Sequence, residues 1–335
     1  MAIRAITRDP MLRLLLLAMV LAALLPATGY WRGVAQMTAN AGIFALFLAN
    51  GMRIPRAEIA SGIANWRFFL PLALWMFGAM ALVGLGLSHG GQAIVPPLVA
   101  IGFLYLGVLP TTVQSSTSYS SLAQGNVALS VIAAASMSIL GVFISVPIFL
   151  ALGGSGEGMV GSDALIKIIL ILILPFAIGQ ILQRRTATFI ARQKARIVWL
   201  DRLVIAFAVY VAFSGAVEQG IWERIDAAEW AATLALVAIF LVVAHAGAWL
   251  ASAALSLARQ DRIAFLFAGA QKSAAIGAPL ATVLFEPAAA GFIVLPLLLY
   301  HFFQLVLAAP LATRLAARSA LRPDASGYDA PTTRS

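Results

Sequence analysis

Apolar stretches of roughly 20 residues recur along the whole chain and are separated by short polar segments. A helix of that length crosses the roughly 30 Å of hydrocarbon in a bilayer. Only helices and closed barrels satisfy the whole backbone in lipid, and these runs are too long and too continuously apolar for barrel strands. The pattern predicts an all-α polytopic membrane protein of ten transmembrane helices. They are expected near residues 11–28, 34–51, 67–88, 94–123, 127–152, 163–183, 199–219, 229–257, 262–285 and 288–318.

The composition supports this class of protein. Of the 335 residues, 62% are hydrophobic and only 10% are charged, whereas a soluble domain carries about 25% charged residues. The lack of cysteine excludes a disulfide framework, a thiolate metal site and a cysteine nucleophile. The net charge of +9 does not indicate nucleic-acid binding, because the basic residues are scattered over short loops and form no basic face.

The distribution of basic residues predicts the orientation in the membrane. With a cytoplasmic N-terminus, the cytoplasmic segments hold 18 of the 22 Lys and Arg residues, whereas the outer loops hold Arg32, Lys167 and Arg224. This positive-inside pattern predicts a multi-pass protein of the inner (plasma) membrane with both termini cytoplasmic. We expect one transmembrane domain over residues 1–321 and, because residues 322–335 are polar, a disordered cytoplasmic tail there.

Polar residues interrupt two of the ten predicted helices. The fourth contains Pro110 and a polar run that continues to Ser121, and the ninth contains Gln271-Lys272-Ser273 followed by Gly277 and Pro279. A proline cannot donate a backbone hydrogen bond, so it favours an interruption. Both interrupted helices occupy the fourth position of a five-helix half of the chain.

The two halves, about 11–152 and 163–318, are expected to be inverted repeats, because an odd number of helices reverses the direction of the second half. Interrupted helices at matching positions of inverted repeats are typical of the binding site of a transporter. The sequence therefore predicts that helices 4 and 9 are broken and cross at such a site.

Four stretches resemble a family of membrane transporters. They are Leu109-Pro110-Thr111-Thr112-Val113-Gln114-Ser115-Ser116, Gln124-Gly125-Asn126-Val127-Ala128, Gln271-Lys272-Ser273 with Gly277 and Pro279, and Leu295-Pro296-Leu297 with Tyr300-His301 and Gln304. By their order and spacing, residues from about 11 to 318 resemble the bile acid:sodium symporter superfamily and, within it, the bacterial SBF-like branch of sodium-dependent transporters.

The resemblance implies a core domain and a panel domain, with the broken helices crossing in the core near mid-membrane. It also implies ion sites made by a Ser-Asn pair at the first break, hydroxyls on the next helix, and a Glu and a Gln around the second break. A sodium ion is accordingly expected near Ser115, Ser116, Ser130 and Gln271. The sequence departs from this pattern, since no Asn accompanies the serines and the Glu position falls near Phe267.

A broken helix exposes N–H groups where one half begins and carbonyls where the other ends. The N–H ends attract anions, and the carbonyl ends attract hard cations together with hydroxyls. Alternatively, the hydroxyls only satisfy the interrupted backbone, and other polar residues only join helices. The candidates for binding substrate or ion are Thr112, Gln114, Ser115, Ser116, Thr117, Ser130, Gln271, Lys272 and Ser273 near the breaks, and Asn50, His301 and Gln304 elsewhere.

Lys272 is the only formal charge deep within an apolar segment. A charge at the bilayer centre costs at least about 2.5 kcal/mol, and the interiors of the predicted helices contain no carboxylate that could neutralise it. We expect its ammonium to occupy the space of a sodium ion or to contact an anionic substrate. The alternatives are that it loses its proton or extends to the membrane interface.

The sequence thus predicts a secondary active transporter that moves a small organic anion by alternating access. No cofactor is expected apart from sodium as the coupling ion. A sodium-independent or proton-coupled carrier is the alternative. An intramembrane enzyme is disfavoured because the helix interiors lack Asp, Glu and Cys, and a sensor is disfavoured because no soluble signalling domain is visible.

Overall fold

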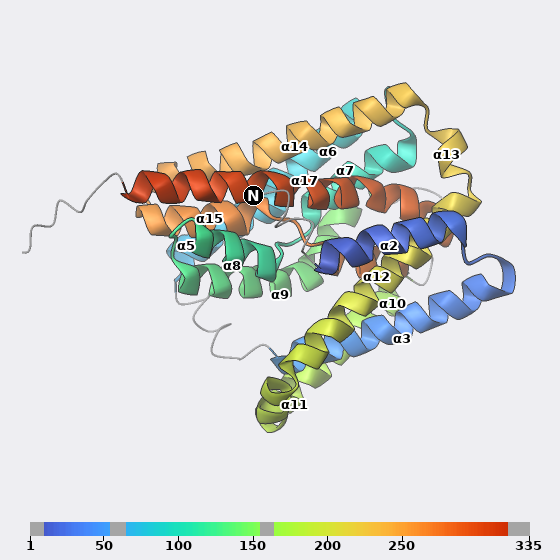
Figure 1. Ribbon diagram of the computed structural model, residues 1–335, viewed down its shortest axis with the longest axis horizontal. Coiled ribbons are helices and arrows are strands. Elements are labelled where there is room, and N and C mark those ends of the chain that lie inside the picture. Colours follow the sequence, from blue (N-terminus) through green and yellow to red (C-terminus); the bar gives the residue numbers. More distant parts are fainter. Residues whose placement is uncertain (1–9, 54–64, 155–163, 321–335) are drawn as a thin grey trace, which may run out of the picture.

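The computed structural model describes residues 10–53, 65–154 and 164–320, and the regular elements of these ranges are helices (Figure 1). The first half contains α2 (Pro10–Leu24), α3 (Gly29–Arg53), α5 (Trp66–Ala73), η1 (Leu74–Ala79), α6 (Met80–Gly91), α7 (Pro97–Val108), α8 (Val113–Leu122) and α9 (Val127–Ala151). The second half contains α10 (Ala164–Ile168), η2 (Ile169–Ile173), α11 (Leu174–Arg192), α12 (Lys194–Glu218), α13 (Ile221–Arg224), α14 (Ala227–Ala254), α15 (Arg259–Ala270), α16 (Ala274–Leu284) and α17 (Pro287–Ala320). The predicted all-α class is confirmed, and the predicted tail, 322–335, lies outside the described residues.

Seven of the described helical segments are long and apolar enough to cross a membrane. An eighth is added when α7 and α8, which are bent by 63° at their junction, count as one span. The other two predicted helices correspond to α2, which has only 15 residues, and to α3, whose polar residues lower its hydropathy. The multi-pass class is therefore confirmed, while the count of ten spans stays a prediction.

Prolines account for differences between the predicted and observed helices. The first helix is expected to reach residue 28, but α2 ends at Leu24 because the residue before Pro26 is disfavoured in the helical conformation. The π-helical turn η1 follows Pro71, and η2 comes just before Pro175. Such turns form where the regular ladder of backbone hydrogen bonds is disturbed.

The sixth helix also continues beyond residue 183, to Arg192.

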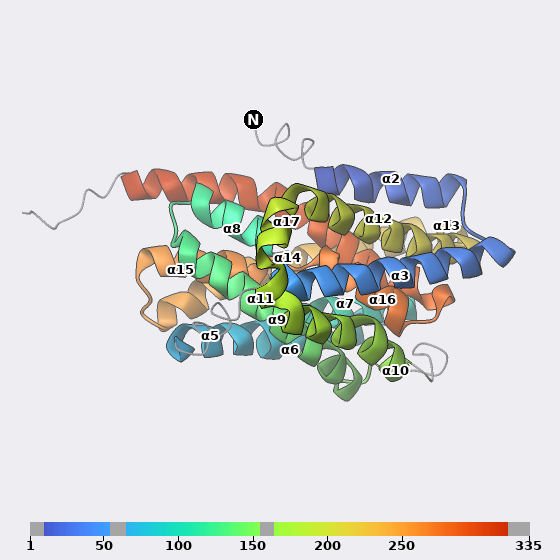
Figure 2. The same ribbon diagram turned by 90° about the horizontal axis from the view of Figure 1, so that it is seen from below.

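Helices α2, α3, α11 and α12 pack together as one group, at the lower right of Figure 1. Ion pairs join α3 to α12 at both ends: Arg53 Nη1 lies 2.9 Å from Asp201 Oδ2, and Arg32 pairs with Glu218. The second group is built around α7, α15, α16 and α17, and it meets the first mainly where α12 packs against α16 and α17. Figure 2 shows the axes of most of these helices lying roughly along the long axis of the molecule.

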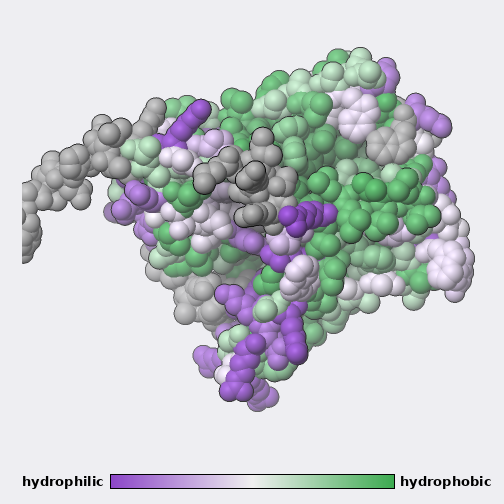
Figure 3. All heavy atoms as spheres, viewed as in Figure 1, coloured by the Kyte–Doolittle hydropathy of each residue, from purple (hydrophilic) through white to green (hydrophobic). Residues whose placement is uncertain are grey.

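Much of the outer surface is apolar, as Figure 3 shows in green. Large side chains such as Ile181, Val242 and Leu250 are 62–71% exposed. Contiguous apolar surface of this kind suits lipid rather than water. The lower tip of the molecule in the same view is hydrophilic, because α11 ends and α12 begins there with a cluster of basic residues: Arg184, Arg185, Arg192, Lys194 and Arg196.

Paired glycines bring two helix pairs into close backbone contact. A Cβ on Gly84 of α6 would lie 2.5 Å from the Phe103 carbonyl of α7 and 3.0 Å from the Cα of Gly107. Gly51 of α3 and Gly179 of α11 meet in the same way, with a Cβ on Gly179 2.4 Å from the Leu48 carbonyl. Small residues allow such approach between membrane helices, where dispersion contacts supply much of the attraction.

The close contact at Gly84 leads to a prediction about stability. Gly84→Ala should lower the free energy of unfolding by about 1–3 kcal/mol, because the new methyl group would overlap a backbone carbonyl that cannot move independently. Thermal unfolding of the purified protein in detergent measures the effect.

Gly86, on the same helix, is the matched control, since no atom lies within 4 Å of a Cβ placed there. Gly86→Ala should raise stability by about 0.5–1 kcal/mol through helix propensity alone. Equal effects of the two substitutions would contradict the proposed role of the glycine contact.

Candidate functional site

The first helix break lies between α7 and α8. Helix α7 ends at Val108, the backbone is extended at Leu109 (ψ 147°) and Thr112 (ψ 119°), and α8 begins at Val113. Pro110 lies in the middle of this segment and donates no backbone hydrogen bond. The predicted interruption of the fourth helix is therefore present, and it bends the chain by 63°.

The second break lies between α15 and α16. Helix α15 ends at Ala270, and the backbone is extended at Gln271 (ψ 136°) and Ser273 (ψ 102°) before α16 begins at Ala274. Ser273 is the N-cap of α16, because its Oγ accepts a hydrogen bond from the N–H of Ile276 at 3.1 Å. The predicted interruption of the ninth helix is present as well, without a sharp bend between α15 and α16.

The two breaks are joined to each other although they are far apart in the sequence. The N–H of Ser273 donates to the carbonyl of Pro110 at 2.9 Å, and Thr112 Oγ1 donates to the carbonyl of Lys272 at 3.0 Å. On the other side, Gly141 of α9 leaves room for the Pro110 ring, which would lie 2.5 Å from a Cβ at that position. The breaks thus form one buried junction in the second helix group.

Every carbonyl from Gly107 to Thr112 accepts a hydrogen bond, so the first break leaves none of them unpaired. This matters because a buried carbonyl without a partner costs about 1–3 kcal/mol. In chain order, the donors are Lys272 Nζ to Gly107, Ser145 Oγ to Val108, Lys272 Nζ again to Leu109, the Ser273 N–H to Pro110, Ser138 Oγ to Thr111 and the Ser116 N–H to Thr112.

Lys272 is fully buried at the junction, so its side chain does not reach the surface of the protein. Its Nζ lies 2.9 Å from the carbonyl oxygen of Gly107, 2.8 Å from that of Leu109 and 3.5 Å from that of Met76. These oxygens lie at the C-terminal end of α7, which carries the negative end of the helix dipole, and on the neighbouring π turn η1. The terminal amine of Lys272 is therefore held by backbone dipoles.

Side chains of α17 bond to backbone groups of the second break. Gln304 contacts the Lys272 peptide twice, since its Oε1 accepts from the N–H at 2.7 Å and its Nε2 donates to the carbonyl at 3.0 Å. The same Nε2 lies 2.8 Å from His301 Nδ1, and Tyr300 donates to the Ala270 carbonyl at 2.7 Å. For His301 and Gln304, the geometry favours the interhelical hydrogen bonds that the sequence left as the alternative.

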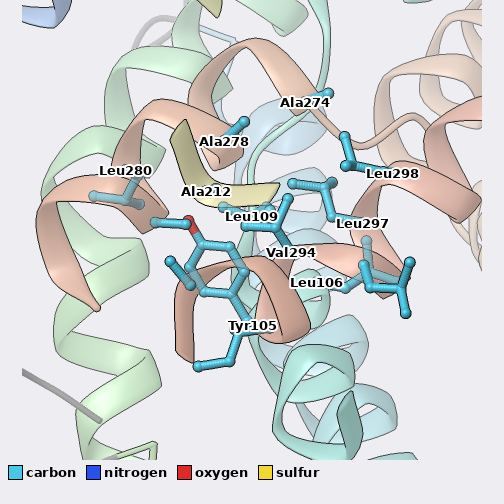
Figure 4. Packing of buried hydrophobic residues seen from close by; sticks show 14 of the residues in the cluster. Tyr105, Leu106, Leu109, Ala212, Ala274, Ala278, Leu280, Val294, Leu297 and Leu298 are labelled. Carbon is cyan, nitrogen blue, oxygen red and sulfur yellow. The ribbon is translucent and has the colours of Figure 1, made fainter. Parts of the chain in front are cut away.

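Tyr105 has a comparable role that the sequence did not reveal. Its hydroxyl, buried within α7, donates to the carbonyl of Gly277 in α16 at 2.6 Å. Figure 4 shows its ring among apolar residues that include Leu109, Ala278 and Val294. The only sequence signal is a tyrosine inside an apolar run, which most often has a packing role.

Several buried polar atoms at the breaks have no hydrogen-bond partner. They include both side-chain amide atoms of Gln271, which is fully buried, and the hydroxyl oxygens of Thr111, Ser115 and Thr117. Unpaired buried polar groups are rare and require an explanation such as a bound solute, ion or water. Ser116 and Ser130 do meet, with their Oγ atoms 3.4 Å apart.

The remaining predicted residues lie in other surroundings. Gln114 is exposed at the start of α8. Asn50 accepts a hydrogen bond from Arg53 near the end of α3, away from both breaks. Phe267, near the position where the resemblance implies a Glu, is fully buried with its ring 5.8 Å from that of Tyr119. Among the described residues, no group of three or more His, Cys, Asp or Glu side chains could hold a metal ion.

The chain is similar to known membrane transporters over most of its length. A protein of Pseudomonas aeruginosa named as uncharacterized is 38% identical over 308 residues, which cover 91% of this chain and 92% of that protein. "Putative symporter YfeH" of Escherichia coli is 34% identical over 311 residues, with the same coverage of 91% and 92%. Sodium/bile acid cotransporter 7 of Mus musculus is 21% identical over 280 residues, 78% of each chain.

A family model agrees with the resemblance that the sequence motifs indicated. The model of the SBF-like CPA transporter family matches residues 9–317, a range that contains both helix breaks. Because this match covers nearly the whole chain, the protein belongs to the SBF-like CPA transporter family.

Proposed function

We propose that this transporter is a secondary active carrier that moves a small organic anion across the inner membrane by alternating access. The observation that supports this most is the buried junction of the two helix breaks, where the Ser273 N–H and Thr112 Oγ1 join segments from opposite halves of the chain. Paired helix breaks of this kind are the usual place for a solute in carriers with inverted repeats.

The helices can be grouped into the ten elements of the predicted repeats. The first repeat would consist of α2, α3, α5–α6, α7–α8 and α9, and the second of α10–α11, α12, α14, α15–α16 and α17. The group of α2, α3, α11 and α12 would be the panel domain, and the group that contains both breaks would be the core domain. The basic cluster at the α11–α12 turn supports a cytoplasmic position for that turn and for both termini.

The starts of α8 and α16 support an anionic substrate. Both half-helices begin at the junction, and the N-terminal end of a helix carries partial positive charge. Thr112 does not cap α8, because its hydroxyl donates to Lys272 instead. The unpaired Gln271 amide and the unpaired hydroxyls of Ser115 and Thr117 offer further hydrogen bonds to such a solute.

A polar seam between the two helix groups supports the proposed motion. A cavity of about 70 Å³ lies there, lined by Gln36 and Asn40 of α3, Lys167 of α10 and Glu286 next to α16, among others. Gln36 Nε2 donates to the Thr282 carbonyl at 3.1 Å and so joins α3 to α16. A few polar contacts of this kind can exchange between two arrangements at lower cost than a packed apolar interface.

The coupling ion has two alternatives. Sodium would bind near Ser115, Ser116, Ser130 and Gln271, and the name of the related cotransporter 7 favours this ion. A sodium-independent or proton-coupled carrier would need no cation there, and the aromatic ring of Phe267 in place of a carboxylate favours it. An enzyme is disfavoured because the family consists of transporters.

Uptake into proteoliposomes tests the proposal. Small carboxylates and sulfonates that raise the unfolding temperature would be radiolabelled, because a ligand that binds the folded state stabilises it. We expect at least one to accumulate unchanged inside vesicles under a sodium or proton gradient. Chemical conversion of the solute would support an enzyme instead, and ion currents far above carrier rates would support a channel.

Gln271 tests the position of the site. Gln271→Leu should leave the unfolding temperature equal or higher, because it removes two unpaired buried polar atoms. The same substitution should lower the rate of uptake by roughly tenfold or more, the equivalent of one hydrogen bond of about 1.4 kcal/mol.

Gln180→Leu is the matched control, because Gln180 Nε2 donates to the Gly51 carbonyl at 2.7 Å in the α3–α11 contact. It should lower stability by about 1 kcal/mol and leave uptake per folded molecule unchanged. Normal uptake by Gln271→Leu would place the solute elsewhere.

A further inference from the structure

The carbonyl end of α7 already holds a basic group that belongs to the protein, the side-chain amine of Lys272. Lys272 Nζ approaches the Gly107 and Leu109 oxygens at 2.9 and 2.8 Å, at the place where a broken helix attracts a hard cation. We infer that the Lys272 ammonium is the resident cation of this junction, and that the protein binds no sodium ion between the two helix breaks.

The ammonium is directed entirely at the backbone. A lysine has three N–H donors and no acceptor, and three carbonyl oxygens lie around Nζ, those of Gly107, Leu109 and, at 3.5 Å, Met76. No N–H is left for a carboxylate of a substrate. The geometry therefore favours the expectation that Lys272 occupies the space of a sodium ion over the expectation that it contacts an anionic solute.

The described carboxylates for which a partner is known are held at other places, and Asp226 and Glu229 bond to each other's backbone N–H at the start of α14. Asp201 pairs with Arg53, Glu218 with Arg32, and Asp261 accepts a hydrogen bond from Asn126 Nδ2 at 2.8 Å. The positive charge of Lys272 is therefore opposed by the dipole of α7 and by individual carbonyls. A mobile cation at this helix end would be stabilised by the same groups.

A second cation would compete with Lys272 directly. A sodium ion bound to the same oxygens would lie within about 4 Å of the ammonium, and repulsion at that distance in a partly screened protein interior weakens binding by roughly a thousandfold. The backbone of Lys272 is also fixed by Gln304 and Thr112, so the side chain begins from a fixed point beside these oxygens.

The inference implies that wild-type stability does not depend on sodium. The full chain, purified in detergent, would be unfolded thermally in sodium chloride and in choline chloride at equal ionic strength. We expect the same unfolding temperature in both salts over the whole titration. A saturable rise with sodium would overturn the inference, and this measurement needs no variant.

Two substitutions then separate the charge from the side-chain volume. Lys272→Ala leaves space beside the Gly107 and Leu109 carbonyls, so its unfolding temperature should fall by several degrees in choline and partly recover, saturably, in sodium. Lys272→Met fills most of that space with an uncharged chain, so it should lose stability without recovery. Lys194→Ala removes an exposed lysine and should change neither value.

Unchanged stability of both Lys272 variants in choline would also overturn the inference. If neither variant can be purified, the sodium titration of the wild type decides. The consequence for the coupling ion rests on the proposed carrier function, but the unfolding measurements do not. A protein that shows the expected salt pattern and transports nothing would refute the proposed function alone.

Discussion

The carbonyl end of α7 stops inside the protein, and the need to satisfy it organises the surrounding helices. In lipid, a helix that ends without partners for its last carbonyls costs several kcal/mol. Here one lysine side chain from the opposite half supplies two of the missing donors, to Gly107 and Leu109. Its own burial is tolerated for the same reason, since the carbonyls replace part of the water that the ammonium loses.

The junction is consequently a network of side-chain donors on rigid helices. Gln304 accepts a hydrogen bond from the N–H of Lys272 and donates one to its carbonyl. Tyr300 and Tyr105 each donate to one further backbone carbonyl. Networks of this kind are stable only when every member is paired. Gln271 is an exception. Its side chain is fully buried at the second break, and neither of its two polar side-chain atoms has a hydrogen-bond partner.

The sequence predicted the helices and both breaks because these depend on local composition. Pro110 and the polar run after it indicate the first interruption, and the charge of Lys272 within an apolar segment indicates the second. The partners of Lys272 could not be predicted, because they are backbone oxygens and any residue could supply them. Similarly, the sequence of α3 does not indicate whether the amide of Asn50 faces the junction or, as in the structure, bonds to Arg53.

The long separation between Lys272 and the end of α7 has a consequence for biosynthesis. The hydrogen-bond donor to the Gly107 oxygen, Lys272, comes 165 residues later in the chain. At about 5–20 residues per second, the ribosome needs roughly 10–30 s to make that stretch. During this interval the first broken helix must remain near water, lipid headgroups or an insertion factor, so the first half of the chain cannot reach its final arrangement before the second half follows.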